Sequence, residues 1–435
     1  MKKHIILSLL VVAFGLTACK KYFGEVNTNP NNPNSVEPKV ILPGIEAAIS
    51  YSFGGDAARY SGILTQQLRG NDRQFLVIQD YKFNGNDVES LYETNIYTKI
   101  LMEIKGLKEI STKNGYHHYN GIAKTLEAYT LLFLADFWDS APYSDAFKGV
   151  NSLQPKYDSH EELYASVFKL LADARIDLSQ ADGGVKLPEN EGSDLMFGGD
   201  VLKWLELTYF IDARANLRLA KADATKYQTV LDLLNTGLNN DFSFPYSGGA
   251  FAHPMNQFNT QWLGSLILGD KITSLLTDYN DPRMPMYSVA FNKNSSYLTE
   301  NKSHVIASLI EQEFIKAECN FRISGSVAAH PFYINAITLA LQRDGVSPVD
   351  IATYLGQASV DPGTITLELI MNQKYIALFL EHETFTDWRR TGFPTLTPNN
   401  GSVVPRRFPI PQSERNLNGA NAPSSTIYKP VTWDI

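Results

Sequence analysis

The amino-acid sequence predicts a mainly α-helical protein. Several segments place apolar residues every three or four positions, the spacing that puts them on one face of a helix. Alternation of apolar and polar residues, which is typical of strands, is scarce. Hydrophobic residues make up 44% of the 435 residues and charged residues 19%, a balance that excludes a disordered chain and supplies a large core. The net charge of −8 argues against a protein that binds nucleic acids by charge.

The first residues have the pattern of an export signal. A basic head precedes the apolar run Ile5–Phe14, which is too short to cross a bilayer because a spanning helix needs about 20 apolar residues. The run is followed by Leu16-Thr17-Ala18-Cys19, a bacterial lipobox. We therefore expect a lipoprotein signal peptide over residues 1–18 and lipid attachment at Cys19. The alternative is an ordinary signal peptide that happens to contain a cysteine.

Residues 19–38 are expected to form a lipidated tether. They are rich in Asn and Pro, which favour turns over helices and strands. The chain has two cysteines, so a lipid on Cys19 would leave Cys319 without a partner for a disulfide within the chain. We expect Cys319 to be a small buried apolar residue on a helix.

The expected helices follow one another through residues 39–435, which we interpret as a single domain. Ser159 is a candidate N-cap of one of them, with Glu162 three residues later. Helix pairs of about 34 residues would be consistent with degenerate tetratricopeptide-like units, although a period alone does not establish them. The apolar residues that define the helices are Ile96, Ile100, Ile104 and Leu107; Ile122, Leu126, Tyr129, Phe133 and Phe137; Leu163, Val167, Leu170, Ala174 and Leu178; Leu202, Leu205, Tyr209, Ala213 and Leu217; and Ile365, Leu369, Ile376 and Leu380.

A loop-rich insertion is expected at about residues 225–360, where the helical pattern weakens. Gly, Pro, Asn and aromatic residues mix there, as in the segment 242–249. Residues 303–309 are too mixed for a strand to be predicted. Long aromatic loops inside a compact domain usually carry function or are well packed.

Signatures of catalysis and of metal binding are mostly missing from the sequence. The segments 160–164 and 382–386 each lack the second His of a zinc-protease motif, and the chain has no phosphate-binding loop ending in Gly-Lys-Ser or Gly-Lys-Thr. The adjacent pair His117-His118 would diverge on a helix, so we expect no metal site and no cofactor there or elsewhere. Paired carboxylates remain possible among the 46 acidic residues. A secreted α-helical glycoside hydrolase is therefore the alternative function.

Motifs in three parts of the chain together resemble the SusD/RagB family of nutrient-binding outer-membrane lipoproteins, in its SusD-like subgroup. One departure is Ile410, where a Tyr before Pro is typical, and another is Lys20-Lys21 after the lipid cysteine in place of acidic residues. The motifs are Phe23–Pro33; Leu134-Ala135-Asp136-Phe137-Trp138-Asp139 with its continuation to Ala146; and Asn372–Glu381 with Asp387-Trp388-Arg389-Arg390-Thr391-Gly392-Phe393-Pro394 and Pro405-Arg406-Arg407-Phe408-Pro409.

The resemblance implies a tetratricopeptide-like helix-pair superhelix whose loop-rich insertions form the binding face. It implies a location on the outer membrane, lipid-anchored and facing the cell exterior. It also implies a SusC-like TonB-dependent transporter as partner, for which the lipoprotein acts as a lid. The ligand would be an oligosaccharide, or a peptide as in RagB-like members, and the protein would have no catalytic activity.

Two segments of this chain match the regions that carry the family's binding face. Residues 69–75, continuing to Tyr81, combine aromatic rings with amides and charged groups in a turn-like setting, and residues 251–262 combine aromatic rings with amides. Sugars present apolar faces to rings and hydroxyls to polar side chains. Each of these residues could instead be structural, because an aromatic residue in a large protein is more often buried than exposed to a ligand. The candidates are Trp262, Phe258, Tyr81 and Phe75 as rings, and Arg73, Asp72, Asn71 and Asn259 as hydroxyl partners.

Other residues of the family motifs are expected to be structural. Trp138 and Trp388 stand beside helix ends and are expected to fill the core. Arg389 and Arg390 are expected to pair with carboxylates such as Glu381 or Asp387 and so to fix the C-terminal helix.

Overall fold

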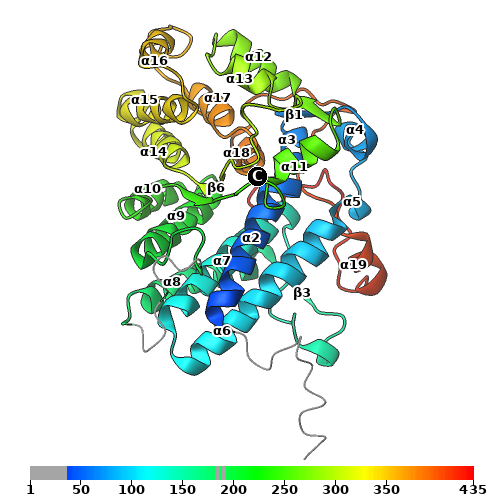
Figure 1. Ribbon diagram of the computed structural model, residues 1–435. Helices are drawn as coiled ribbons and strands as arrows, with labels where there is room; N and C mark the ends of the chain where they lie inside the picture. The colour runs from blue at the N-terminus through cyan, green and yellow to red at the C-terminus, as the bar shows by residue number, and fades with distance from the viewer. Residues whose placement is uncertain (1–36, 182–186, 188–192) are drawn as a thin grey trace, which may run out of the picture.

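The computed structural model describes residues 37–181, 187 and 193–435. Residues 1–18, Cys19 and the tether up to residue 36 lie outside the described residues, so their expected roles stay predictions. The described chain is mostly helical, as the sequence predicts (Figure 1). None of its helices is both long enough and apolar enough to cross a bilayer.

The helices of the first half include two π-helical segments, η1 and η2. They are α2 (Pro38–Ser52), η1 (Phe53–Ala57), α3 (Ala58–Leu64), α4 (Arg73–Gln79), α5 (Gly85–Glu89), η2 (Ser90–Leu101), α6 (Met102–Asn114), α7 (His117–Trp138), the short 3-10 helix η3 (Gly149–Asn151), α8 (His160–Leu178) and α9 (Val201–Leu219).

The longest helices of the second half are α14 and α15. The helices of this half are α10 (Lys226–Leu234), α11 (Pro254–Gln261), α12 (Asp270–Asp278), α13 (Met284–Ser288), α14 (Leu309–Ser324), α15 (Ser326–Arg343), α16 (Pro348–Leu355), α17 (Leu367–Ala377), α18 (Glu383–Thr391) and α19 (Gln412–Leu417).

The helices predicted from apolar spacing are confirmed. The predicted N-cap of α8 is also confirmed, because Ser159 and Glu162 form a capping box in which each side chain accepts a hydrogen bond from the other residue's amide. The last predicted helix is shorter than its pattern, since α17 begins after Ile365 and ends before Leu380.

Neighbouring helices stack into a helix-pair superhelix. Helix α6 packs on α7, α7 on α8, α8 on α9, α9 on α10, α10 on α14 and α14 on α15. Figure 1 shows α8, α9, α10, α14, α15 and α16 stacked along one side of the molecule, while α4 and α11 lie on the other side. This repeated packing is the tetratricopeptide-like architecture that the resemblance implies.

The described residues contain three short antiparallel strand pairs, two of which join segments that are distant in sequence. Strand β1 (Leu68–Gly70) pairs with β5 (Leu266–Leu268), and Arg69 lies opposite Ile267. The other pairs are β2 (Ala141–Pro142) with β3 (Tyr157–Asp158), and β4 (Phe242–Phe244) with β6 (His304–Ala307). Strand β6 lies in the segment 303–309, for which the sequence predicts no strand.

The prediction of a loop-rich insertion over residues 225–360 is wrong for its last third. Residues 309–343 form two long helices, α14 and α15. Their buried residues do follow helical spacing, as Phe314 and Ala317 show on α14. Gly325 between the two helices and Pro331 inside α15 interrupt that pattern in the sequence. Residues 235–308, by contrast, consist of short helices and strands joined by loops.

The family motifs meet in the core. The indole Nε1 of Trp138 donates a hydrogen bond to the Pro409 carbonyl at 2.8 Å, and the Phe408 amide donates to the Phe137 carbonyl at 2.9 Å. Trp138 and Trp388 are buried, as predicted, and so is Cys319. Motifs from the middle and the end of the chain thus hold one another in place.

The two predicted arginine pairs differ in outcome. The Arg390 guanidinium donates to Asp387 at 2.8 Å, as predicted, and also to Glu318 at 2.6 Å. The prediction for Arg389 is wrong, because this side chain donates to the carbonyl of Asp136 and lies over the ring of Phe385, 4.2 Å from its centre. Burial without a directly paired carboxylate lowers the pKa of Arg389 to about 10.

Candidate functional site

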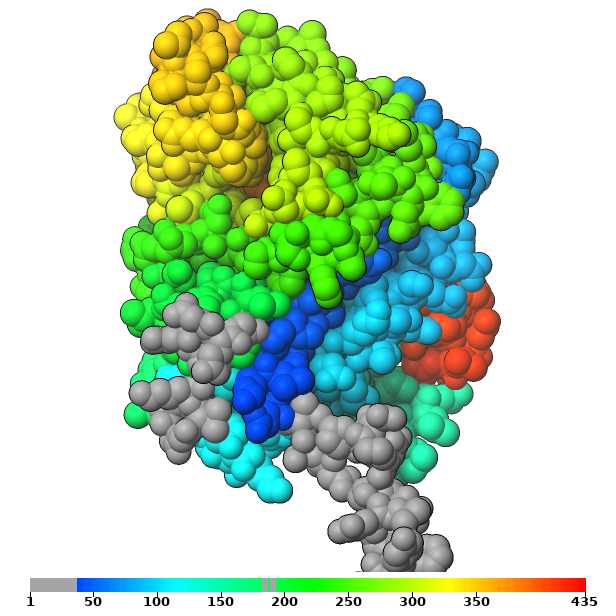
Figure 2. All heavy atoms as spheres, viewed as in Figure 1, coloured from blue at the N-terminus to red at the C-terminus, as the bar shows by residue number. Residues whose placement is uncertain are grey.

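The β1–β5 pair brings the two predicted binding segments together. Strand β1 runs directly into the Asn71–Phe75 segment, and β5 begins a short loop after Trp262, the residue that follows α11. The Asn71 amide nitrogen donates to the Ser265 carbonyl at 2.9 Å, and the Asn71 side chain donates to the Gly264 carbonyl at 3.0 Å. Gly264 has a φ of +83°, a conformation that favours glycine. Figure 2 shows the blue residues of α4 beside green residues of the α11 region at one edge of the molecule.

Arg73 and Trp262 form the exposed centre of this junction. The guanidinium carbon of Arg73 lies 4.1 Å from the centre of the Trp262 ring, within the range of a cation–π contact. Asp72 caps α4 by accepting a hydrogen bond from the Arg73 amide at 2.8 Å, and its carboxylate lies 3.3 Å from the Arg73 Nε. Trp262 remains 43% exposed, so its indole offers surface to a ligand.

An aromatic wall continues inward from Trp262. The rings of Phe75 and Phe258 meet edge to face with their centres 5.0 Å apart. The guanidinium of Arg59 lies 4.6 Å from the centre of the Phe258 ring. Phe75 is buried and supports the wall from behind, whereas Phe258 is only partly buried. Of these two predicted rings, Phe258 is the one that can face a ligand.

The wall lines a polar groove of about 230 Å³ between α3, α4 and α11. Three glutamines, Gln74, Gln257 and Gln261, line it together with Asp56 and Arg59. Arg59 is buried and pairs with Asp56, and its Nε has no hydrogen-bond partner among the described residues. The groove thus places aromatic surface, amides and one ion pair around a single space.

Three of the residues that line this groove were not identified from the sequence. Tyr51, Asp56 and Arg59 belong to α2, η1 and α3, helices that the sequence analysis did not associate with binding. The sequence feature that could have pointed to these helices was the pair Gly54-Gly55 within an otherwise helical stretch. A Cβ at Gly54 would lie 2.7 Å from the His304 ring, so η1 and β6 approach each other closely only because glycine is present. The π-helix η1 begins just before this pair, and π-helical turns are frequent at functional sites.

Phe75, Phe258 and Trp262 line the groove, whereas the other five predicted site residues do not: Asn71, Asp72, Arg73, Tyr81 and Asn259. Tyr81 is only 4% exposed, and its hydroxyl accepts a hydrogen bond from the Asn399 amide at 3.0 Å. Asn259 is buried, and its side chain donates to the Asn292 carbonyl at 3.2 Å. The expected stacking role of Tyr81 therefore does not fit this structure, and Asn259 holds a neighbouring loop.

Helix α11 is anchored at its first turn by His253. The His253 Nδ1 accepts a hydrogen bond from the Met255 amide at 3.2 Å, which requires an unprotonated nitrogen. Burial, reinforced by the charges of Lys302 and Arg59, lowers the pKa of His253 to about 3. The neutral ring therefore caps the helix throughout the physiological pH range.

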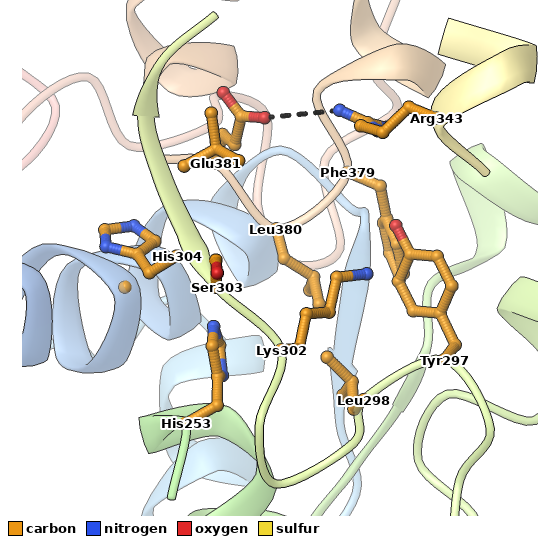
Figure 3. A pocket seen from close by; sticks show the side chains of 12 residues that line it. His253, Tyr297, Leu298, Lys302, Ser303, His304, Arg343, Phe379, Leu380 and Glu381 are labelled. Atoms are coloured by element: carbon orange, nitrogen blue, oxygen red, sulfur yellow. Dashed lines mark ion pairs between the residues drawn. The ribbon is translucent and has the colours of Figure 1, made fainter. Parts of the chain in front are cut away.

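A small cavity of about 60 Å³ lies behind His253 (Figure 3). Lys302, Arg343 and Glu381 contribute its charged groups, and Figure 3 shows Glu381 joined to Arg343. Burial raises the pKa of Glu381 to about 8 and lowers the pKa of Lys302 to about 8. The cavity is too small for a sugar ring, and we interpret it as part of the support of α11. Among the described residues, no group of three or more His, Cys, Asp and Glu side chains could hold a metal ion.

Comparison with known proteins decides the family. A family model described as SusD-like, starch-binding and associating with the outer membrane matches residues 30–302 and 290–411. The chain belongs to this SusD-like family. No curated protein sequence matches it.

Solved structures share the fold of this SusD-like chain. A SusD/RagB family protein from Bacteroides thetaiotaomicron superposes with a TM-score of 0.77 at 22% identity, covering 92% of this chain and 99% of that chain. A chitin-binding SusD homologue from Flavobacterium johnsoniae superposes with a TM-score of 0.72 at 19% identity, covering 92% of this chain and 97% of that chain. A structure described as Bacteroidetes AC2a SusD-like reaches a TM-score of 0.78 at 17% identity, covering 92% of this chain and 100% of that chain.

Proposed function

We propose that this SusD-like protein is a lipoprotein of the outer membrane that binds nutrient oligosaccharides in the groove beside Trp262. It then delivers them to a SusC-like TonB-dependent transporter, for which it acts as a lid. The observation that carries the proposal is the convergence of Phe258 and Trp262 with three glutamines around one groove, with the guanidinium of Arg73 over the Trp262 ring. The starch-binding description of the family and the chitin-binding neighbours support a glycan as the ligand.

The chemistry of the groove suits a sugar. The apolar face of a pyranose ring can stack on the exposed indole of Trp262, as planar ligands stack on aromatic residues. The amides of Gln74, Gln257 and Gln261 can both donate and accept, which matches hydroxyl groups that do the same. Peptides offer a similar mixture of groups and are the second ligand class to be tested.

We propose that the protein does not hydrolyse its ligand. Hydrolysis of a glycosidic bond ordinarily needs two carboxylates about 5–10 Å apart across the bond. Among the described residues that line the groove, Asp56 supplies the single carboxylate, and it is paired with Arg59. This composition suits retention of a glycan and lacks the acid–base pair of a hydrolase.

We also propose that Cys19 carries the lipid and that residues 20–36 link it to α2, with the groove on the exterior of the cell. The lipobox and the outer-membrane association of the family support this arrangement. Mass spectrometry of the mature N-terminus tests it. A mature chain that starts at an unmodified residue other than Cys19 would contradict it.

Binding of a glycan array and a peptide panel to the soluble protein without residues 1–19 tests the function. We expect glycans to bind and Trp262→Ala to weaken their binding by about 1–3 kcal/mol. Release of shorter glycans by the purified protein would instead favour a hydrolase. Recovery of a large β-barrel transporter with the lipidated protein would support the delivery step, and its absence from such a pull-down would count against that step.

A further inference from the structure

Three hollows follow one another around α11. The first is the groove beside Trp262, and the second, of about 390 Å³, shares Gln257 and Gln261 with it. The third hollow, of about 690 Å³, shares Asn256, Thr260 and Glu300 with the second. Because each hollow shares lining residues with the next, the three lie side by side around the helix, and together they are called the furrow below.

The far wall of the furrow is held in place by α11 itself. The Asn256 side chain donates to the Leu298 carbonyl at 2.7 Å, and the Asn259 side chain donates to the Asn292 carbonyl at 3.2 Å. The His253 amide donates to the Glu300 carbonyl at 2.8 Å. One helix therefore positions both the groove beside Trp262 and the loop of residues 292–301, which reduces the ordering cost of a ligand that touches both.

The third hollow, called the distal hollow below, has the surface of a binding site for neutral polar groups. Lys293, Asn294, Thr299 and Asn301 line it and are exposed, and their side chains form no hydrogen bond within the described part of the chain. Lys293 is balanced by Glu300, so the lining carries no excess of one charge. A neutral chain of hydroxyl and amide groups matches this surface better than an acidic or a basic ligand does.

We propose that the distal hollow is a second glycan subsite, which binds the units of a linear neutral oligosaccharide that extend beyond Trp262. This inference rests on the proposed function of the groove. A helix with its side chains is about 10–12 Å across, so a ligand that reaches both flanks of α11 must contain several sugar units. The protein then recognises the length of a glycan as well as its individual rings.

Titration calorimetry with short and long glycans tests this inference. The probes are the disaccharide and the hexasaccharide of the β-linked N-acetylglucosamine series and of the maltose series. In the series that binds, we expect the wild-type protein to bind the hexasaccharide more tightly. The double variant Asn294→Ala/Asn301→Ala should weaken hexasaccharide binding by about 5–10-fold, because two hydrogen bonds are lost. Binding of the disaccharide should be unchanged.

Asn416→Ala, an exposed asparagine on the remote helix α19, is the matched control and should change neither affinity. An unchanged hexasaccharide affinity in the double variant would overturn the distal subsite, as would an equal loss for both lengths. Glycan binding that does not depend on length would also overturn it while leaving the proposed function standing. Failure of the wild-type protein to bind either series would overturn the subsite for these glycans, and an array without any glycan ligand would overturn the proposed function.

Discussion

The guanidinium of Arg73 lies over the indole of Trp262, 4.1 Å from the ring centre, and this contact joins the start of α4 to the end of α11. The contact fixes the orientation of the Trp262 ring, because an exposed tryptophan at a helix end would otherwise sample several rotamers. We therefore expect Arg73→Ala to weaken glycan binding by about 2–5-fold, from the loss of about 0.5–1 kcal/mol of cation–π energy. Arg73→Lys keeps the charge and serves as the matched control. An unchanged affinity for Arg73→Ala in calorimetry would show that Trp262 needs no such support.

Tyr81, unlike Arg73, is expected to affect stability and not glycan binding. Its ring is buried and its hydroxyl accepts a hydrogen bond from the Asn399 amide, so we expect Tyr81→Phe to leave glycan affinity unchanged. The free energy of unfolding should fall by about 0.5–1.5 kcal/mol, as for the loss of one hydrogen bond. Urea unfolding and calorimetry measure the two quantities on the same variant. A loss of affinity with unaltered stability would return Tyr81 to the binding site.

The buried pair between Arg390 and Glu318 should dominate the stability of the C-terminal helices. Arg390 pairs with both Glu318 and Asp387, and Asp387 also pairs with Lys374. Glu318→Gln therefore leaves two buried cations with one carboxylate between them. We expect the free energy of unfolding to drop by about 3–5 kcal/mol. Glu109→Gln removes an exposed partner of Lys105 and should cost about 0.3–0.5 kcal/mol at most. Similar effects of the two variants in urea unfolding would contradict the structural role of Arg390.

Two buried histidines predict a loss of stability in acid. Burial lowers the pKa of His253 to about 3 and that of His382 to about 4, whereas an unfolded chain has values near 6.5. The unfolded state therefore binds more protons between those limits. The stabilisation is fully present above about pH 6.5 and is lost as the pH falls toward 4 and then 3.

His253→Asn isolates one of these groups, because Asn can still cap α11 without titrating. Each histidine contributes a slope of about 1.4 kcal/mol per pH unit within its range. The variant should therefore show a shallower fall of unfolding free energy between pH 6 and 4 than the wild-type protein. Identical slopes for the two proteins would show that His253 is not held neutral by burial.

Sequence reasoning predicted the helices because apolar spacing is a local property. It failed over α14 and α15, where Gly325 and Pro331 interrupt the pattern although buried residues hold the helices in place. Arg389 was misassigned because backbone carbonyls, which no sequence pattern marks, accept its hydrogen bonds. These errors share one cause, since tertiary contacts decide where local signals are weak.

The site was only half predictable for the same reason. Arg73, Phe258 and Trp262 stand out in polar, aromatic segments, and the structure brings them together. The pairing of β1 with β5 that joins them is a long-range contact. Asp56 and Arg59 belong to helices without a binding signature, and only the approach of α11 places them in the groove.

Fluorescence quenching by acrylamide tests the central claim most directly. Of the five tryptophans, Trp138, Trp204, Trp388 and Trp433 are buried and Trp262 is exposed, so the quencher reports mainly on Trp262. We predict that a saturating hexasaccharide ligand, from the N-acetylglucosamine or maltose series, protects the fluorescence of the wild-type protein. The same ligand should have no effect on the residual quenching of Trp262→Phe. A glycan that binds by calorimetry yet leaves the quenching of the wild-type protein unchanged would contradict binding at Trp262.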